Sequence, residues 1–183
     1  MVLVTRQAVT ADGPRLWALN NLPNVGETAD ATVPLALPVP DAAPAEFPDL
    51  ADVVTTCIGA GGDFAVVELD RHLVGMGGIK PSGDGHAEVL RVRTHPATRR
   101  RGVGRAVMTA LERSASALGV QELHLDTADN QPDAMRFYRA LGYTEVTRKT
   151  QPDWTWTLVF YAKRLAAGPA GDAGHPFLVS RVR

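Results

Sequence analysis

Positive charge and glycine are concentrated in one short segment, residues 99–106, which reads RRRGVGRA. The first turn of a helix carries unpaired backbone N–H groups and a partial positive charge, and glycine lets a bulky anion approach the backbone closely. A strand, an Arg-x-x-Gly-x-Gly turn and a helix therefore predict a pyrophosphate site, in which backbone groups bind the phosphates. A solvated basic turn is the alternative. The candidate site comprises Arg99, Arg100, Arg101, Gly102, Val103, Gly104 and Arg105.

Two well-known pyrophosphate motifs fit this segment poorly. A dinucleotide site needs Gly-x-Gly-x-x-Gly directly after a strand, whereas Val107 stands at the third position and residues 94–101 intervene. An acid does follow at a suitable distance, as Glu122 or Asp126, so a nicotinamide-dependent oxidoreductase stays an alternative. The phosphate loop of nucleotide triphosphatases needs Gly-Lys-Ser/Thr, which is absent. Coenzyme A is therefore the better candidate ligand.

Composition favours one ordinary globular domain. The chain has 183 residues, of which 45% are hydrophobic, and its net charge is −1. This charge argues against nucleic-acid or membrane partners bound through bulk electrostatics, and no aromatic residues are interleaved with the arginines. Cys57 is the single cysteine, so no disulfide framework is expected. The single cysteine suits a reducing cytoplasm, which is the location we expect. We also expect no signal peptide, because no basic start is followed by an apolar run, and no membrane span, because apolar stretches stay well below ~20 residues.

The elements that must position these residues follow from hydrophobic periodicity. Apolar residues recur at three- and four-residue steps from Val103, which predicts a helix over 103–118. Alternation predicts a last strand over 153–165, with Trp154 and Trp156 in the core. The segment from 87 to 127 should form a right-handed parallel crossover. Further strands are expected at 2–5, 63–70, 72–80, 87–96, 120–128 and 143–148, and further helices at 14–20, 49–58 and 132–141.

Two segments lack such periodicity. Residues 21–48 are rich in proline and alanine, which predicts a loop. A loop of this length in a small domain is often a substrate lid, with a plain surface excursion as the alternative. Residues 166–183 predict a loosely held C-terminal tail. We therefore expect a single domain over residues 1–165.

Three stretches give the chain a resemblance to the GNAT superfamily of acyl-CoA N-acyltransferases. EVLRVRTHPATRRRGVGRAVMTALE resembles the family's strand, Arg-x-x-Gly-x-Gly pyrophosphate loop and helix. LHLDTADNQPDAMRFYRALGY resembles its next strand and the helix ending in Phe-Tyr-x-x-Leu-Gly-Tyr, and WTWTLVFYAKRL resembles its final strand. The resemblance covers residues 63–165. It implies an α/β fold with a mixed, largely antiparallel central sheet and helices on both faces.

The resemblance also assigns roles along the coenzyme. In the family the pantetheine arm pairs with the strand before the loop, which maps to Val92, Arg93 and Thr94. The central strands splay apart there, and a backbone N–H at or near Val92 would polarise the thioester carbonyl. Many relatives have an asparagine ahead of the next helix; Gln131 has that place here and Asn130 precedes it, so either amide is a candidate. The alternatives are ordinary strand residues and turn formation before the helix.

Acyl transfer to an amine needs an acid and a base. Tyr138 matches the tyrosine that the family often uses as general acid toward the departing thiolate, with core packing as the alternative. Asp126 lies where some relatives carry a catalytic glutamate, and Glu88 stands at the start of the coenzyme-binding strand, so we rank these two level as the base. His124 shares a strand face with Asp126 and ranks third. Each of the three is otherwise a surface or structural residue.

The resemblance predicts an N-acetyltransferase that moves an acetyl group from acetyl-CoA to a small-molecule or peptide amine by direct attack in a ternary complex. We expect no metal, because His72, His86 and His95 fall at separate turns and lack metal-ligand spacing. Cys57 is interpreted as a buried structural thiol, since direct transfer needs no acyl-cysteine. A non-catalytic coenzyme A sensor is the alternative function, and a homodimer is the oligomer that C-terminal strands of such folds often support.

Overall fold

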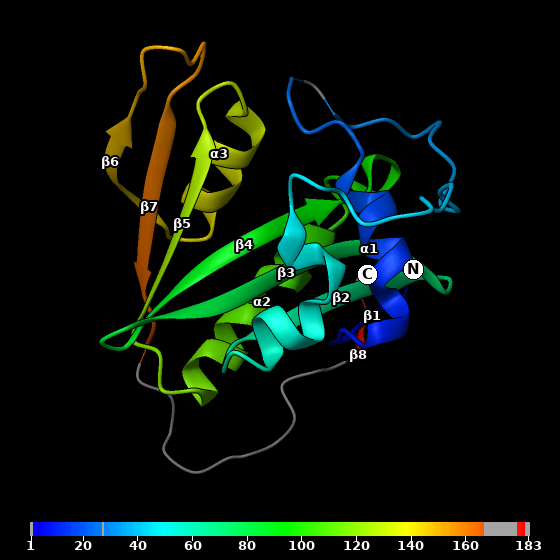
Figure 1. Ribbon diagram of the computed structural model, residues 1–183, viewed down its shortest axis with the longest axis horizontal. Coiled ribbons are helices and arrows are strands. Elements are labelled where there is room, and N and C mark those ends of the chain that lie inside the picture. The colour runs from blue at the N-terminus through cyan, green and yellow to red at the C-terminus, as the bar shows by residue number, and fades with distance from the viewer. Residues whose placement is uncertain (1, 27, 167–178, 182–183) are drawn as a thin grey trace.

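A single eight-stranded sheet forms the centre of the computed structural model, which describes residues 2–26, 28–166 and 179–181 (Figure 1). The strand order is β6-β7-β5-β4-β3-β2-β1-β8. The strands are β1 (Val2–Gln7), β2 (Asp63–Leu69), β3 (His72–Gly83), β4 (His86–Thr94), β5 (Glu122–Ala128), β6 (Thr144–Lys149), β7 (Leu158–Arg164) and β8 (Val179–Arg181). The helices are α1 (Gly13–Asn20), α2 (Val103–Ala117) and α3 (Pro132–Ala140), with short turns η1 (Thr10–Asp12), η2 (Pro48–Ala51), η3 (Val54–Ile58) and η4 (Pro96–Thr98).

Strands β4 and β5 are parallel, and all the other pairs in the described chain are antiparallel. This confirms the predicted mixed, largely antiparallel sheet and the parallel pairing of the two strands that α2 connects. The β4–β5 pairing runs only from His86 opposite Glu122 to Glu88 opposite His124. Both strands continue beyond that point, and Figure 1 shows them diverging into an open V. The V leaves the second half of β4 without a strand partner on that side.

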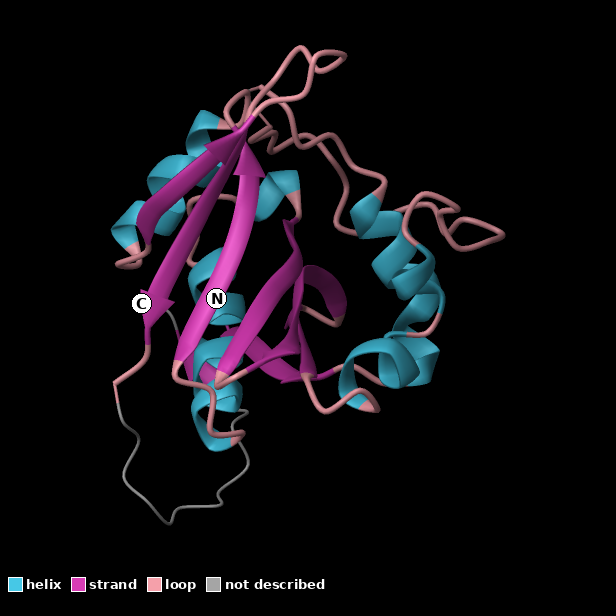
Figure 2. Cartoon of the chain, turned by 60° about the vertical axis from the view of Figure 1, so that its left-hand side comes forward, coloured by secondary structure: helices cyan, strands magenta, loops and turns pink. Residues whose placement is uncertain are grey.

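Apolar side chains alternate between the two faces of the sheet. In β2, Ala65 and Val67 belong to the core that includes α2 and α3, whereas Phe64 and Val66 belong to the core that includes α1, η2 and η3. Helices therefore cover both faces, as predicted (Figure 2). Every helix in the described chain is too short or too polar to span a membrane.

Residues 49–58 do not form the single helix that periodicity predicted. They form the two turns η2 and η3, separated at Asp52, whose backbone is non-helical with φ −150° and ψ 83°. The Asp52 carboxylate accepts hydrogen bonds from the backbone N–H and the hydroxyl of Thr55. A side-chain bond to the N–H three residues later caps the start of a helical turn, so the chain begins η3 there and does not continue η2.

The C-terminal part of the sheet also differs from expectation. Strand β7 begins at Leu158, and Trp154 and Trp156 precede it as a stacked, half-buried pair with ring centroids 4.2 Å apart, not as core residues. Residues 179–181 pair with β1 as β8, in a segment expected to be a loose tail. The rest of that expected tail, 167–178 and 182–183, lies outside the described residues.

Candidate active site

A cavity of about 470 Å³ lies where the end of β4 meets the first turns of α2 and α3; we call it the α2 cavity. The structure brings most of the predicted coenzyme-binding residues into its wall. They are Val92, Arg93, Thr94, Arg99, Arg100, Gly102, Gly104, Arg105 and Gln131. Residues from β4, the arginine-rich turn and the start of α3 are thus assembled around one space, although they are separated in sequence.

The first turn of α2 carries backbone N–H groups that donate a hydrogen bond to no acceptor in the described chain. The first hydrogen bond into the helix runs from Ala106 N to Gly102 O at 2.9 Å, which leaves the N–H groups of residues 102–105 without an acceptor in the described chain. Gly102 has φ +83°, a left-handed conformation that favours glycine. This turn therefore has the geometry of an anion site at a helix N-terminus.

Three residues of the predicted loop have side-chain positions that do not face the α2 cavity or that serve packing as well. A Cβ on Gly104 would lie 3.0 Å from Cζ of Phe137, so glycine here lets α3 pack closely against α2. The Val103 side chain is buried in the core, which leaves only its backbone to face a ligand. Arg101 is exposed and lines neither this cavity nor its neighbour.

A second cavity of about 660 Å³ fills the V between β4 and β5; we call it the β5 cavity. Its wall includes Glu88 from β4, and Asp126 and Asn130 from β5 and the turn after it. Cys57 is buried, as predicted, but it lies in this wall, and burial raises the pKa of its thiol. The two cavities share six lining residues: Asn24, Val92, Arg93, Gln131, Ala134 and Tyr138.

Tyr138 lies at the junction of the two cavities. It is 8% exposed, and its ring packs near Tyr143 and Tyr161, with centroid distances of 6.0 and 6.3 Å. Burial raises the pKa of Tyr138 to about 12, and the nearby Arg93 opposes this rise. The phenol is therefore protonated at neutral pH and can serve as a proton donor, while its ring contributes to the core.

Arg93 lies beside Tyr138 without a carboxylate within ion-pair distance among the described residues. Its buried Nε lacks a hydrogen-bond acceptor there, and Nη1 reaches Val92 O only at 3.5 Å. When the Asn24 amide oxygen is turned inward, it lies 3.2 Å from both Nη atoms. Burial lowers the pKa of Arg93, but a guanidinium stays charged at neutral pH. The junction thus holds a cation suited to a polarised or anionic group.

The two predicted base candidates, Asp126 and Glu88, both line the β5 cavity. Asp126 is open to the cavity, yet the surrounding protein raises the pKa of its carboxyl, an effect that Arg91 opposes. A raised pKa brings a carboxylate nearer to the pH at which a general base is most effective. Glu88 lines the same cavity. His124 lines neither cavity and lies instead with His86 and Glu122.

The middle of the 21–48 segment is held against the turn before α2 by two hydrogen bonds. The backbone N–H of Asp30 donates to Pro96 O at 3.3 Å, and His95 Nε2 lies 3.0 Å from Pro34 O. His95 is fully buried, and burial lowers its pKa, so the ring is neutral and Nε2 is its donor. The segment is thus held against the turn that leads into α2.

Just beyond this segment, Arg91 binds the Asp49 carboxylate with two hydrogen bonds of 2.8 Å and lies over the Phe47 ring at 4.3 Å. The sequence indicated neither this ion pair nor the position of Asn24, because both depend on contacts between residues far apart in the chain.

The family model described as the acetyltransferase (GNAT) family matches residues 35–143, more than half of the chain. Many solved structures share the fold, among them the three described next. An acetyltransferase of the GNAT family from Staphylococcus aureus Mu50 has a TM-score of 0.71 at 15% identity, and the match covers 90% of this chain and 99% of that one. A GNAT superfamily phosphinothricin acetyltransferase from Sinorhizobium meliloti, in complex with acetyl-CoA, has a TM-score of 0.70 at 20% identity, covering 93% and 92%.

The ribosomal-protein-S18-alanine N-acetyltransferase from Escherichia coli has a TM-score of 0.62 at 16% identity, covering 93% of this chain and 97% of that one. No curated protein matches the chain. The family match and the shared fold define an acyltransferase enzyme. The chain belongs to the acetyltransferase (GNAT) family, as the sequence resemblance predicted.

Proposed function

We propose that the protein transfers an acetyl group from acetyl-CoA to a primary amine of a small molecule or peptide, by direct attack in a ternary complex. The observation that carries this proposal is the meeting of the two cavities at Val92, Arg93 and Tyr138. One cavity ends at unpaired N–H groups, which suit a pyrophosphate. The other includes the carboxylates of Asp126 and Glu88, which form no ion pair in the described chain and suit an amine. A donor and an acceptor bound in these cavities would meet beside a protonated phenol.

The residues of the α2 cavity fit acetyl-CoA, which supplies the activated thioester. The N–H groups of residues 102–105 would bind its diphosphate, with Arg99, Arg100 and Arg105 adding positive charge. Residues 92–94 follow the last β4–β5 pair, so their backbone can pair with the pantetheine. Gln131 lines both cavities and Asn130 only the β5 cavity, which favours Gln131 as the amide that meets the pantetheine.

Different residues near the junction would accept and donate the protons of the reaction. Asp126 or Glu88 would accept the proton of the attacking amine, directly or through water. A backbone N–H near Val92, together with Arg93, would stabilise negative charge on the carbonyl oxygen. Tyr138 would donate its proton to the departing sulfur. We propose that the 21–48 segment selects the acceptor, because its Asn24 belongs to the wall of both cavities.

The test is release of free thiol from acetyl-CoA in the presence of a panel of amines that includes small molecules, amino acids and peptides. We expect saturable release with at least one amine, and calorimetric binding of acetyl-CoA without any amine. Tight binding with no release for the whole panel would indicate a coenzyme A sensor. Binding of a nicotinamide dinucleotide but not of acetyl-CoA would overturn the proposal.

A further inference from the structure

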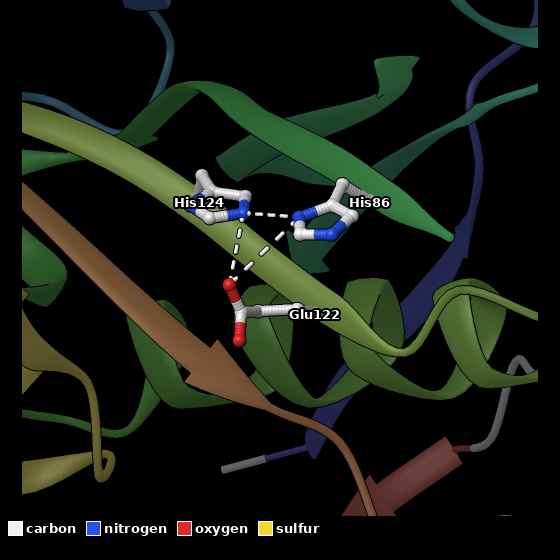
Figure 3. A group of neighbouring side chains, drawn as sticks. All are labelled: His86, Glu122 and His124. Atoms are coloured by element: carbon white, nitrogen blue, oxygen red, sulfur yellow. Dashed lines mark hydrogen bonds and ion pairs between the residues drawn. The ribbon is translucent and has the colours of Figure 1, made fainter. Parts of the chain in front are cut away.

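Three metal-ligating side chains converge at the closed end of the V, where β4 and β5 are still paired (Figure 3). We propose that His86, Glu122 and His124 form a binding site for a divalent transition-metal ion, with Zn²⁺ as the ion that their chemistry fits best. This site lies outside both cavities and does not depend on the acetyl-transfer proposal.

The parallel strand register creates the cluster. His86 begins β4 and lies opposite Glu122 at the start of β5, while Glu88 lies opposite His124. Because side chains alternate along a strand, Glu122 and His124 project from one face of β5. Figure 3 shows the three side chains turned toward one another above this pair of strands. The expectation of no metal rested on spacing along the sequence, which does not reveal residues 38 positions apart that become neighbours through strand pairing.

The distances suit a single ion. His86 Nδ1 lies 2.7 Å from His124 Nε2, and Glu122 Oε1 lies 3.1 Å from His124 Nε2 and 3.8 Å from His86 Nδ1. Tetrahedral zinc with ligand bonds near 2.0–2.1 Å would separate its ligand atoms by about 3.3 Å. The three observed distances lie on either side of that value, and both imidazole rings would have to turn so that their lone pairs meet at one ion.

Hydrogen bonding accounts for one side of this triangle, because the His86 and His124 rings differ by only 10° in plane and their nitrogens lie 2.7 Å apart. It does not account for Glu122 Oε1, which lies near the same two nitrogens. Each neutral imidazole nitrogen is either a donor or an acceptor. His124 Nε2 is close to both other atoms, so a proton on it can point well at only one of them. A cation at the centre would instead accept the lone pairs of all three atoms. Arg164 Nε lies 3.3 Å from the other carboxylate oxygen, Oε2, and this contact directs Oε1 toward the histidines.

The donor set identifies the class of ion. Two imidazoles and one carboxylate suit zinc and related transition metals, whereas Ca²⁺ and Mg²⁺ prefer oxygen ligands throughout. The side chains of His86 and His124 are 42% and 39% exposed, so an ion can enter and a water molecule can take a fourth position. A bound ion would join β4 to β5 just before they separate, two residues along each strand from Glu88 and Asp126.

The experiment is calorimetric titration of the chelator-treated full chain with zinc chloride, together with its visible absorption spectrum in cobalt chloride. We expect one saturable zinc site, a tetrahedral cobalt spectrum and a rise in Tm with zinc. His124→Ala and the isosteric Glu122→Gln should each weaken zinc binding at least about tenfold. His72→Ala removes a histidine outside the cluster and should change nothing.

The inference fails if the wild-type chain shows no saturable zinc binding, or if Glu122→Gln, His124→Ala and wild type bind zinc equally. A purely octahedral cobalt spectrum would also overturn it. Circular dichroism of each variant checks folding, and Glu122→Gln, which keeps the side-chain shape, remains informative even if a histidine variant unfolds. None of these readouts depends on acetyl transfer.

Discussion

At the scale of single residues, the chemistry depends on where protons reside around the cavity junction. Tyr138 keeps its proton because burial raises its pKa, and Asp126 holds its proton to a higher pH than an ordinary aspartate. Arg93 places a positive charge beside both cavities. A neutral donor and a carboxylate tuned toward neutrality are the pair that amine acylation needs.

Replacing Tyr138→Phe should lower kcat by about 100-fold, because it removes the proton donor and keeps the buried ring. The Kd for acetyl-CoA should not change. Steady-state thiol release and calorimetry measure the two quantities. Tyr143→Phe is the matched control, since Tyr143 is also buried but lines neither cavity. An undiminished kcat in Tyr138→Phe would show that Tyr138 contributes to core packing and not to proton donation.

The pH dependence of kcat/KM should identify the base. The carboxylate must be deprotonated to accept a proton, so activity should rise with pH through the elevated pKa of Asp126. Asp126→Asn should remove this rise and lower kcat/KM by about 100-fold. Glu88→Gln, on the neighbouring strand β4, is the comparison, and its kcat/KM should still rise with pH. The reverse pattern would assign the base to Glu88.

At the scale of elements, the start of α2 and the anchored 21–48 segment determine what the cavities can hold. Gly102 gives the turn before α2 its left-handed backbone, and Gly119 has φ +78° at the other end of the same helix. The neutral ring of His95 ties the segment to the turn that precedes α2. Each feature gives an experiment in which stability and binding can be separated.

Gly102→Ala should weaken acetyl-CoA binding by altering the turn that positions the free N–H groups, and it should also cost about 1–2 kcal/mol of stability through the left-handed backbone. Gly119→Ala should cost a similar amount of stability, because it too has a positive φ and no neighbouring atoms within 4 Å. Only Gly102→Ala should change coenzyme affinity. Equal losses of affinity in both variants would mean that general destabilisation is the cause.

His95 should make the fold sensitive to mild acid. Its folded pKa is lowered, so the unfolded chain takes up the proton first, and stability falls as pH drops below about 6.5 toward the folded value. His95→Gln should keep a donor for Pro34 O and flatten this part of the pH profile. Urea unfolding from about pH 8 to about pH 5 measures the effect. An unchanged slope in the variant would place the acid sensitivity elsewhere.

At the scale of the whole molecule, the near-zero net charge contrasts with the local concentration of arginine beside the α2 cavity. Long-range attraction for an anionic coenzyme must therefore come from this patch. The V between β4 and β5 places the β5 cavity directly beside the α2 cavity, with which it shares part of its wall.

Acetyl-CoA affinity should accordingly fall as salt is added, because the Debye length shrinks from about 10 Å at 0.1 M salt to about 3 Å at 1 M. Arg100→Ala should reduce this salt dependence. Arg113→Ala makes the same change in net charge on the exposed side of α2, away from both cavities, and should leave it intact. Calorimetry at several ionic strengths gives both slopes, and identical slopes for the two variants would contradict the local origin.

The sequence predicted those features that neighbouring residues determine. Alternating apolar residues predicted the strands, and glycine beside arginine predicted the start of α2. Features that depend on distant pairing were not predictable. His86 and His124 become neighbours only through the β4–β5 register, and Asn24 reaches the junction from a proline-rich loop. The predicted 49–58 helix is divided in two because Asp52 has a non-helical backbone and caps a new turn through Thr55.

The shared wall between the two cavities links the occupancy of one to the occupancy of the other. Asn24, Arg93 and Gln131 each border both spaces, so a ligand that orders these side chains on one side changes the free energy of filling the other. By thermodynamic reciprocity, the factor by which donor changes acceptor affinity equals the factor by which acceptor changes donor affinity. We therefore expect the cooperativity between the proposed donor and acceptor to depend on the side chains at this boundary.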